Sequence, residues 1–213
     1  MKKFTKVIAA VLALTFIVTA FAACSGGSKA KVKVIDFNLT TENYAFGVDK
    51  AQPELLTSVN EFIAEIKENG EFDEVCNKYF SDGTPSPVTS ATLDDSKDQL
   101  LVATNAAFAP FEYTEGDKFL GIDMEIAALL AEKLGKELVI QNMDFDSVCL
   151  SVGQHKSDIA MAGVKKKKKR EQYVTFSDAY YEASQKLIVP ADNTEFDECK
   201  SADEIMTILN AKD

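Results

Sequence analysis

Apolar and polar residues alternate or cluster along the chain in a way that predicts short strands. Residues 32–39 alternate between apolar and polar side chains, which is typical of a strand with one buried face, and residues 44–48 predict a second short strand. Further along the chain, compact apolar runs indicate buried strands. These later predicted strands cover residues 99–104, 138–142, 158–163 and 187–189.

Helices are predicted where apolar residues recur every three or four positions. Pro53 opens the first of these segments, and Asn69-Gly70 ends it as a C-cap. A short helix is predicted over Phe72–Phe80, with Phe72, Val75, Tyr79 and Phe80 facing inward. The remaining predicted helices cover residues 124–134, 147–154 and 201–209.

The order of these elements predicts an α/β fold with a mostly parallel sheet flanked by helices. Two strand–helix–strand crossovers carry this prediction, because such a connection joins strands that run in the same direction. Ligands of such sheets bind at the carboxyl ends of the strands. Asn105, Phe145 and Gly163 fall at or just after such ends, so this edge of the sheet is expected to carry a binding site.

The N-terminus has the layout of a secretory signal, which predicts a body outside the cytoplasm. A lysine cluster precedes an apolar run over residues 7–23, and the run ends in small residues directly before Cys24. This pattern predicts a signal peptide over 1–23 and a lipid on Cys24, with a Gly/Ser tether over 24–30. An ordinary export signal and an uncleaved membrane anchor are the alternatives. The protein is expected on the extracellular face of the membrane or in the periplasm.

Charge and cysteine spacing exclude several classes of partner. The formal net charge of the sequence is −11, and such an acidic surface makes nucleic acid an unfavourable partner. Cys76, Cys149 and Cys199 are expected to be buried, inert thiols, with one disulfide and a free thiol as the alternative. No CxxC spacing, GxxxxGK or GxGxxG occurs, so neither a metal nor another cofactor is expected.

Motifs in the second half of the chain occur in an order that resembles a known family. They are Val102-Ala103-Thr104-Asn105, Phe108-Ala109-Pro110-Phe111-Glu112-Tyr113, Gly121-Ile122-Asp123-Met124-Glu125-Ile126-Ala127, Asp158-Ile159-Ala160-Met161-Ala162-Gly163 and Phe176-Ser177-Asp178-Ala179-Tyr180-Tyr181. They resemble the amino-acid-binding (family 3 type) extracellular solute-binding proteins of ABC importers. The resemblance implies one lobe of a periplasmic-binding-protein-like fold, a polar amino acid as the small-molecule ligand and ABC permease subunits as partners.

The resemblance also implies an unusual order of segments. Residues 31–80 resemble the C-terminal end of the family and are expected to pack on a lobe-one core over 98–190, to which the flexible linker 81–97 joins them. Residues 191–213 are expected to be a crossover and the start of a lobe two that is otherwise missing. The chain is therefore interpreted as permuted or truncated. A non-functional remnant of a tandem binding protein is an alternative, and a dimer stays open.

Ligand-binding roles follow from the same resemblance. Arg170, seven residues after Gly163, is expected to hold the ligand carboxylate with its planar guanidinium, and Gly163 to let the ligand approach closely, with backbone amides after it as donors. Phe108 and Phe145 match rings that sandwich the ligand in the family. Asn105 matches a position that helps to recognise it, and Tyr113 is a further candidate.

Lys165 departs from the family, which usually has serine or threonine at this position. A lysine there favours an anionic ligand group or damages the site, and the run Lys165–Lys169 is a solvated loop or a surface patch for anionic lipid or wall polymer. With a lobe missing, weak amino-acid binding is expected. Glu112 and Asp144 lie near the loops expected to form the cleft, where acid–base residues of an enzyme would be found. Since no histidine or pair of carboxylates stands out in the pattern, an enzyme is not expected. A non-transport interaction module built on the Lys165–Arg170 loop is the alternative.

Overall fold

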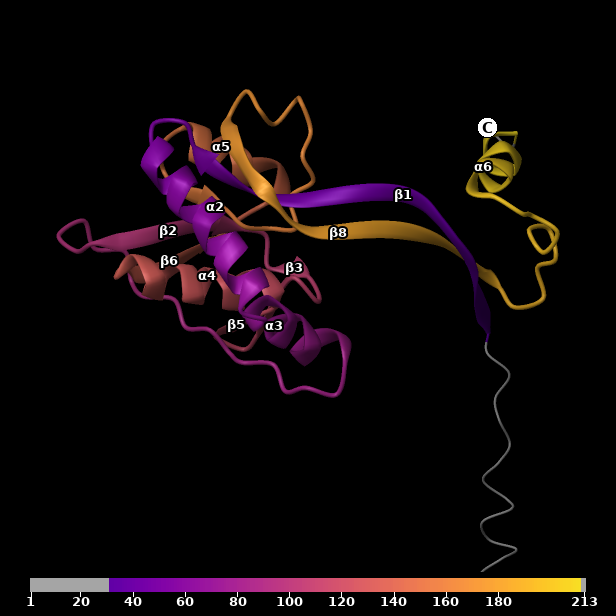
Figure 1. Ribbon diagram of the computed structural model, residues 1–213, viewed down its shortest axis with the longest axis horizontal. Helices are drawn as coiled ribbons and strands as arrows, with labels where there is room; N and C mark the ends of the chain where they lie inside the picture. Colours follow the sequence, from indigo (N-terminus) through magenta and orange to yellow (C-terminus); the bar gives the residue numbers. More distant parts are fainter. Residues whose placement is uncertain (1–30, 212–213) are drawn as a thin grey trace, which may run out of the picture. The chain divides into compact units, whose positions relative to one another are not determined.

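The computed structural model describes residues 31–211 (Figure 1). Two compact units divide these residues. The larger unit covers Thr40–Gln185, and the smaller unit holds residues 31–39 and 186–211. Two long strands, β1 (Val32–Asp49) and β8 (Val174–Pro190), have residues in both units. The predicted signal peptide, the tether and Cys24 lie outside the described residues.

The main sheet has five strands in the order β6-β2-β7-β1-β8. Strand β2 (Gln99–Thr104) is parallel to β6 (Glu137–Asn142) on one side and to β7 (Ile159–Ala160) on the other, and β1 is antiparallel to β7. The order follows from the two crossovers that the sequence predicted, since each crossover returns the chain to a parallel neighbour. The predicted α/β class with a mostly parallel sheet is therefore confirmed.

A small antiparallel sheet follows the carboxyl end of β2. It consists of β3 (Ala107–Phe108), β4 (Glu112–Glu115) and β5 (Lys118–Leu120), with β4 in the middle. The turn between β4 and β5 lies at Gly116, where the chain reverses with Glu115 opposite Lys118. This sheet places aromatic residues next to the edge of the main sheet.

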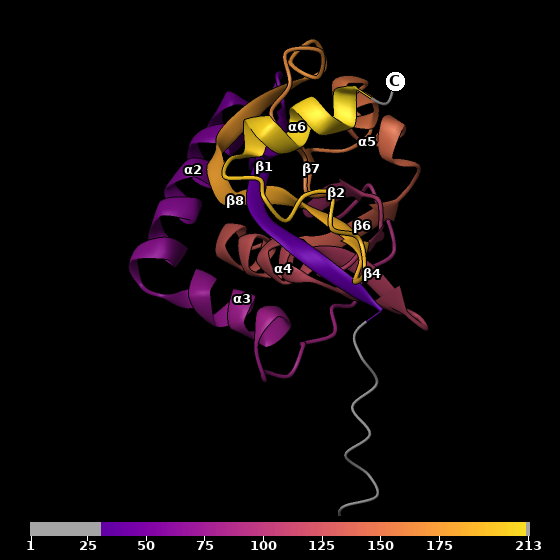
Figure 2. The same ribbon diagram turned by 90° about the vertical axis from the view of Figure 1, so that its right-hand side faces the viewer.

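Helices cover both faces of the main sheet (Figures 1 and 2). On one face lie α2 (Pro53–Glu68), α3 (Glu71–Phe80) and α4 (Ile122–Leu134), and on the other lies α5 (Phe145–Gly153). Pro53 starts α2 and Asn69 caps its end, as the sequence predicted. Gly121 precedes α4 with φ 123°, and a Cβ atom there would stand 2.1 Å from the Phe111 carbonyl oxygen. The start of α4 therefore requires glycine.

Two large apolar clusters form most of the core of the larger unit, one on each face of the sheet, and a third, smaller cluster contains Val88, Met124 and Ile140. Neighbouring strand residues alternate between them, because successive side chains of a strand point to opposite faces. Val102 and Ile159 belong to the first cluster, and Ala103 and Ala160 to the second. The first cluster also contains Phe46 and Phe62, Ile126 and Leu130, and Tyr180, so the residues before and after segment 81–97 share one core.

Some predictions about individual elements are wrong. The expected break between residues 39 and 44 does not exist, since β1 runs without interruption to Asp49, and β8 begins at Val174 rather than Leu187. Strands β1 and β8 are hydrogen-bonded neighbours in the same sheet, and pairing between strands can keep polar residues extended. Phe80 does not face inward: it is the last residue of α3 and is 53% exposed.

Segment 81–97 lacks helices, as predicted, but it is fixed along the larger unit rather than flexible. Val88 exchanges two backbone hydrogen bonds with Phe119, at 2.8 and 3.0 Å, and the Ala91 amide donates to the Leu138 carbonyl oxygen at 2.8 Å. The Ser86 amide donates to Glu125 at 2.9 Å. These bonds tie the segment to β5, β6 and α4.

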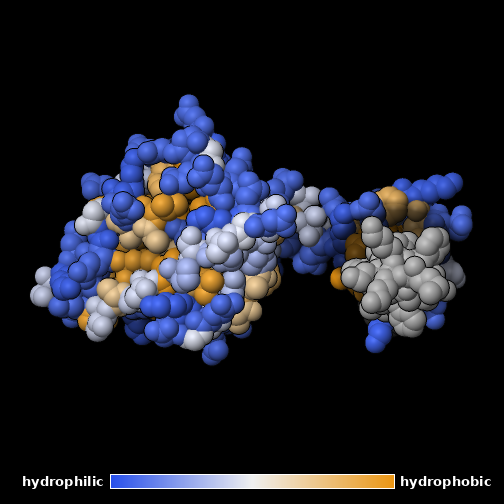
Figure 3. Space-filling model, turned by 90° about the horizontal axis from the view of Figure 1, so that it is seen from below, coloured by the Kyte–Doolittle hydropathy of each residue, from blue (hydrophilic) through white to orange (hydrophobic). Residues whose placement is uncertain are grey.

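The smaller unit has its own apolar cluster, around Ile35, Val189, Phe196 and Ile205. Helix α6 (Ala202–Asn210) contributes to it, and Ser201 caps the helix by accepting a hydrogen bond from the Glu204 amide. None of the helices within residues 31–211 combines the length and the apolar character needed to cross a bilayer. Hydrophilic side chains cover most of the face of the larger unit seen in Figure 3, with apolar side chains between them.

Candidate functional site: a pocket at the edge of the sheet

A cavity of about 400 Å³ lies in the larger unit, at the carboxyl ends of the parallel strands. All of the predicted ligand-binding residues except Tyr113 line it: Asn105, Phe108, Phe145, Gly163, Lys165 and Arg170. Tyr113 instead packs edge-on against the ring of Tyr79, with the ring centroids 6.5 Å apart. Within the described residues, the cavity is lined by five separate stretches of sequence, namely 42–44, 105–112, 145, 162–170 and 185.

Arg170 is held in a defined position on the cavity wall. Its Cζ atom lies 4.8 Å from the centroid of the Phe145 ring, and its Nη1 atom donates a hydrogen bond to the Lys165 carbonyl oxygen at 3.0 Å. A guanidinium group has five N–H donors, so this single bond leaves it able to form a two-point contact with a carboxylate. The ring beneath it adds a cation–π contact.

The two aromatic side chains expected to contact the ligand, Phe108 and Phe145, are both partly exposed to solvent. Phe108 in β3 stacks on Phe111, with centroids 5.7 Å apart, and is 44% exposed, while Phe145 at the start of α5 is 39% exposed. Both rings are thus exposed on the cavity wall rather than buried in the core. The Asn105 side-chain amide donates to the Met143 carbonyl oxygen at 2.8 Å, which fixes its orientation.

The missing side chain of Gly163 allows the Phe108 ring of the protein itself to lie close to the backbone. Its φ is 51°, and a Cβ atom there would lie 3.1 Å from the Phe108 ring. Its amide donates to Asp123 Oδ2 at 2.8 Å. The glycine therefore positions Phe108 and Asp123, in addition to any role towards a ligand.

Lys165 is paired with a residue that sequence reasoning missed. Its Nζ atom lies 2.9 Å from Glu42 Oε1, and Glu42 is itself on the cavity wall. Tyr44 in β1 forms an antiparallel β-bridge with Lys165. This bridge brings Lys165 close to Glu42, which lies two residues before Tyr44 in the same strand. Nothing local in the sequence around Glu42 could have indicated a partner so far along the chain.

A buried pair of carboxyl groups lies beside the cavity, although the sequence pattern showed none. Glu112 is 1% exposed and lines the cavity, and Asp123 is fully buried next to it. Asp123 accepts hydrogen bonds from the Gly163 amide at 2.8 Å and from the Tyr180 hydroxyl at 2.6 Å. Hairpin β4–β5 returns the chain so that these two acids meet. Burial and the Asp123 charge raise the pKa of Glu112 to about 11.

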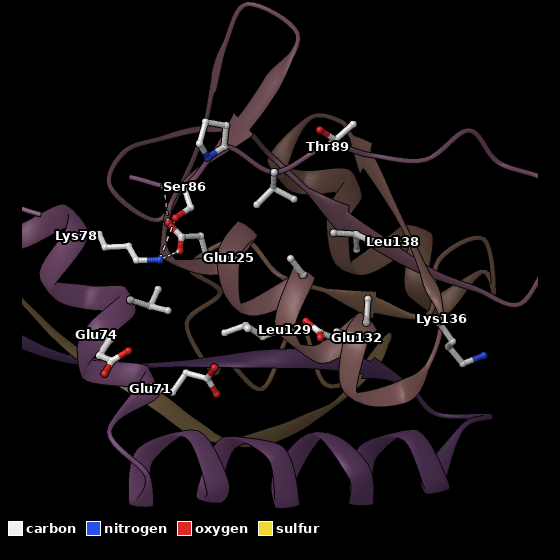
Figure 4. A pocket seen from close by; sticks show the side chains of 15 residues that line it. Glu71, Glu74, Lys78, Ser86, Thr89, Glu125, Leu129, Glu132, Lys136 and Leu138 are labelled. Atoms are coloured by element: carbon white, nitrogen blue, oxygen red, sulfur yellow. Dashed lines mark hydrogen bonds and ion pairs between the residues drawn. The ribbon is translucent and has the colours of Figure 1, made fainter. Parts of the chain in front are cut away.

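A larger hollow, of about 580 Å³, lies between α3, α4 and segment 81–97 (Figure 4). None of the predicted ligand-binding residues lines it. Its central acid, Glu125, is bonded by Lys78 Nζ, by the Tyr79 hydroxyl at 2.6 Å and by the Ser86 amide at 2.9 Å. Because these groups satisfy one another's hydrogen-bonding capacity and link α3, α4 and segment 81–97, this hollow is a weaker candidate for a ligand site.

Metal chemistry and disulfides find no support within residues 31–211. No group of three or more His, Cys, Asp or Glu side chains there is arranged to hold a metal ion. Cys76, Cys149 and Cys199 are free thiols, and only Cys149 is fully buried, so the expectation of three buried thiols is wrong for Cys76 and Cys199. Burial raises the pKa of the Cys149 thiol, which keeps it unreactive.

Residues 100–212 match the protein family described as "Bacterial extracellular solute-binding proteins, family 3". The chain belongs to this family. It is 36% identical over 100 residues to the arginine-binding extracellular protein ArtP of Bacillus subtilis, a match that covers 47% of this chain and 39% of ArtP. It is also 34% identical over 82 residues to a cyclohexadienyl dehydratase of Pseudomonas aeruginosa, covering 38% of this chain and 31% of the dehydratase.

Among solved structures, the arginine-bound form of domain 1 from TmArgBP is 29% identical with a TM-score of 0.39, covering 56% of this chain and 99% of that one. The chain spans well under half the length of the two curated relatives, 39% of ArtP and 31% of the dehydratase. The family is one of binding proteins, although this dehydratase is among the relatives.

Proposed function

We propose that this chain is the extracellular substrate-binding component of an ABC importer for polar amino acids, anchored to the membrane by a lipid on Cys24. Family membership supports the class of protein, and the names of the relatives support amino acids as ligands. In this proposal the larger unit is lobe one of the binding protein, with residues 40–80 and 98–185 contributing to it. ABC permease subunits are the partners that receive the ligand.

The position of Arg170 carries this proposal. A free amino acid always presents a carboxylate, and its recognition requires a cation that is fixed before the ligand arrives. Arg170 is fixed by the Phe145 ring and by the Lys165 carbonyl oxygen, and it shares a cavity with the exposed ring of Phe108. The cavity can therefore hold the carboxylate at the guanidinium and an aliphatic or polar side chain between the rings.

The test is an NMR titration of the full chain with a panel of polar amino acids. We expect chemical-shift changes around the cavity with dissociation constants in the roughly millimolar range, because all described walls belong to one unit. Arg170→Ala removes a charge-assisted contact of about 1.5–3 kcal/mol and should weaken binding by about tenfold to a hundredfold. Lys168→Ser, an exposed change in the same loop, is the matched control and should leave binding unchanged.

An interaction with an anionic surface is the second candidate function. Lys166, Lys167, Lys168 and Lys169 are consecutive and exposed, which favours contact with anionic lipid or wall polymer. Salt-sensitive binding to anionic vesicles that is lost when all four are replaced by serine, together with no response to any amino acid, would favour this function over the first.

A further inference from the structure

The cavity wall contains a buried polar side chain, Glu112, that takes no part in the proposed binding of the ligand carboxylate by Arg170. Glu112 lies on the cavity wall at 1% exposure, and within the described residues its Oε2 atom has no hydrogen-bond partner. A buried, unpaired carboxyl group is costly, so its position beside a cavity indicates a group that bonds to a polar atom of the ligand.

The surroundings of Glu112 decide which form of the acid is present. Asp123 takes the two hydrogen-bond donors at this place, the Gly163 amide and the Tyr180 hydroxyl, and these stabilise the charged form of Asp123. Its pKa is still raised by burial, to about 6, so it is ionised at neutral pH. Glu112 has a pKa raised to about 11 by burial and by Asp123, and it keeps its proton.

Other titratable groups near Glu112 do not reverse this assignment. Tyr44 on β1 and Tyr180 on β8 both have pKa values raised above the usual tyrosine value, mainly by burial, and are neutral. On the cavity wall, the cations are Lys165, Lys167 and Arg170, and the exposed-side anion is Glu42. Glu42 is paired with Lys165, and the ionised Asp123 beside Glu112 offsets one of the two remaining cations, so the site keeps only a small net positive charge.

A neutral carboxylic acid offers one donor and one acceptor side by side. A primary amide presents the complementary pair, so the two groups can form two parallel hydrogen bonds without any charge being buried. A cationic side chain, such as a guanidinium or ammonium group, would instead favour the ionised form of Glu112, so its binding carries the cost of driving off the proton.

We propose that Glu112 recognises the ligand side chain as a neutral carboxylic acid, so that the cavity takes amino acids with an amide side chain, glutamine or asparagine, in preference to cationic ones such as arginine. This inference rests on the proposed function, because it places the ligand carboxylate at Arg170. It assigns the side-chain end of the cavity to Glu112 in β4.

The experiment measures glutamine and arginine binding to the full chain at pH 7 by calorimetry. We expect glutamine to bind at least tenfold more tightly than arginine. Glu112→Gln keeps one donor and one acceptor and should retain glutamine binding within about threefold, whereas Glu112→Met should lose about tenfold. Glu115→Gln, an exposed change on the same hairpin, is the control, and circular dichroism checks that each variant is folded.

A measurement on the unmodified chain needs no variant. Calorimetry in two buffers of different ionisation enthalpy counts protons exchanged per ligand bound, and glutamine should release none. Arginine binding that equals or exceeds glutamine binding, or glutamine binding that releases a proton, would overturn the inference. Unchanged glutamine binding in Glu112→Met would do the same, and all of these results leave the proposed function intact. Failure of both amino acids to bind, or binding that ignores Arg170→Ala, would overturn the proposed function and the inference together.

Discussion

Replacing Glu112 with glutamine should stabilise the protein at neutral and alkaline pH. The unfolded chain holds this acid at its ordinary pKa of about 4.3, whereas the folded chain raises it to about 11. Between these values folding takes up a proton, so the free energy of unfolding falls by up to about 1.4 kcal/mol for each pH unit. The stabilisation is complete below about pH 4 and is lost progressively up to pH 11.

At pH 7 this uptake costs about 3.7 kcal/mol, since the pH lies about 2.7 units above the unfolded pKa. Glutamine has the shape and hydrogen-bonding groups of the protonated acid but takes up no proton. Glu112→Gln should therefore raise the free energy of unfolding by up to about 3.7 kcal/mol at pH 7, by more at pH 8.5, and by only about 1 kcal/mol at pH 5. Asp123, with its pKa raised to about 6, is present in both proteins and leaves this difference largely unchanged.

Urea unfolding of both chains at the three pH values measures the difference directly. Glu115→Gln on the exposed side of the same hairpin should change stability by less than about 0.5 kcal/mol at every pH. A difference between Glu112→Gln and the natural chain that stays constant with pH would refute the reasoning. So would a loss of stability in Glu112→Gln at pH 7, because that result requires an ionised and paired Glu112.

Two further predictions concern packing. Phe46→Ala should lower the free energy of unfolding by about 3–5 kcal/mol, since the Phe46 ring is buried and stacks on Tyr180 with centroids 4.3 Å apart. Phe80→Ala, at an exposed position, should cost less than about 1 kcal/mol. Equal losses of stability in urea unfolding would contradict the core described above. Gly121→Ala should lower the free energy of unfolding by more than about 2 kcal/mol, because its Cβ atom would overlap the Phe111 carbonyl group at 2.1 Å. A melting temperature within a degree or so of the natural chain would show that this prediction is wrong.

Local sequence signals predicted the elements whose ends and faces are set locally. The apolar spacing and the Pro53 and Asn69 ends defined α2, and the apolar run before Asn105 defined β2. Strands β1 and β8 were predicted only in part, because residues 40–43 are polar and their extended conformation depends on pairing between strands far apart in sequence. Strand pairing of this kind leaves no mark within a short window of sequence.

The candidate site divides in the same way. Arg170, Phe108 and Phe145 could be predicted because motif order carries their positions, and the structure brings them into one cavity. Glu42 and the burial of Glu112 could not be predicted, since each depends on a contact made by folding. A glutamate in a hairpin is expected to be exposed, and only the return of the chain into α4 places Glu112 beside Asp123.

The residues before segment 81–97 therefore have more than a packing role. Strand β1 supplies Glu42 and Tyr44 to the cavity wall, and the same strand supplies Phe46 to the core beneath it. Glu42 pairs with Lys165, and the Tyr44 ring packs edge-on against Phe111, the residue before Glu112. If β1 were displaced, Lys165 would lose its partner and Glu112 would become solvated and ionised at neutral pH. The charge of the cavity, and hence the ligand it favours, is thus coupled to the packing of the first strand.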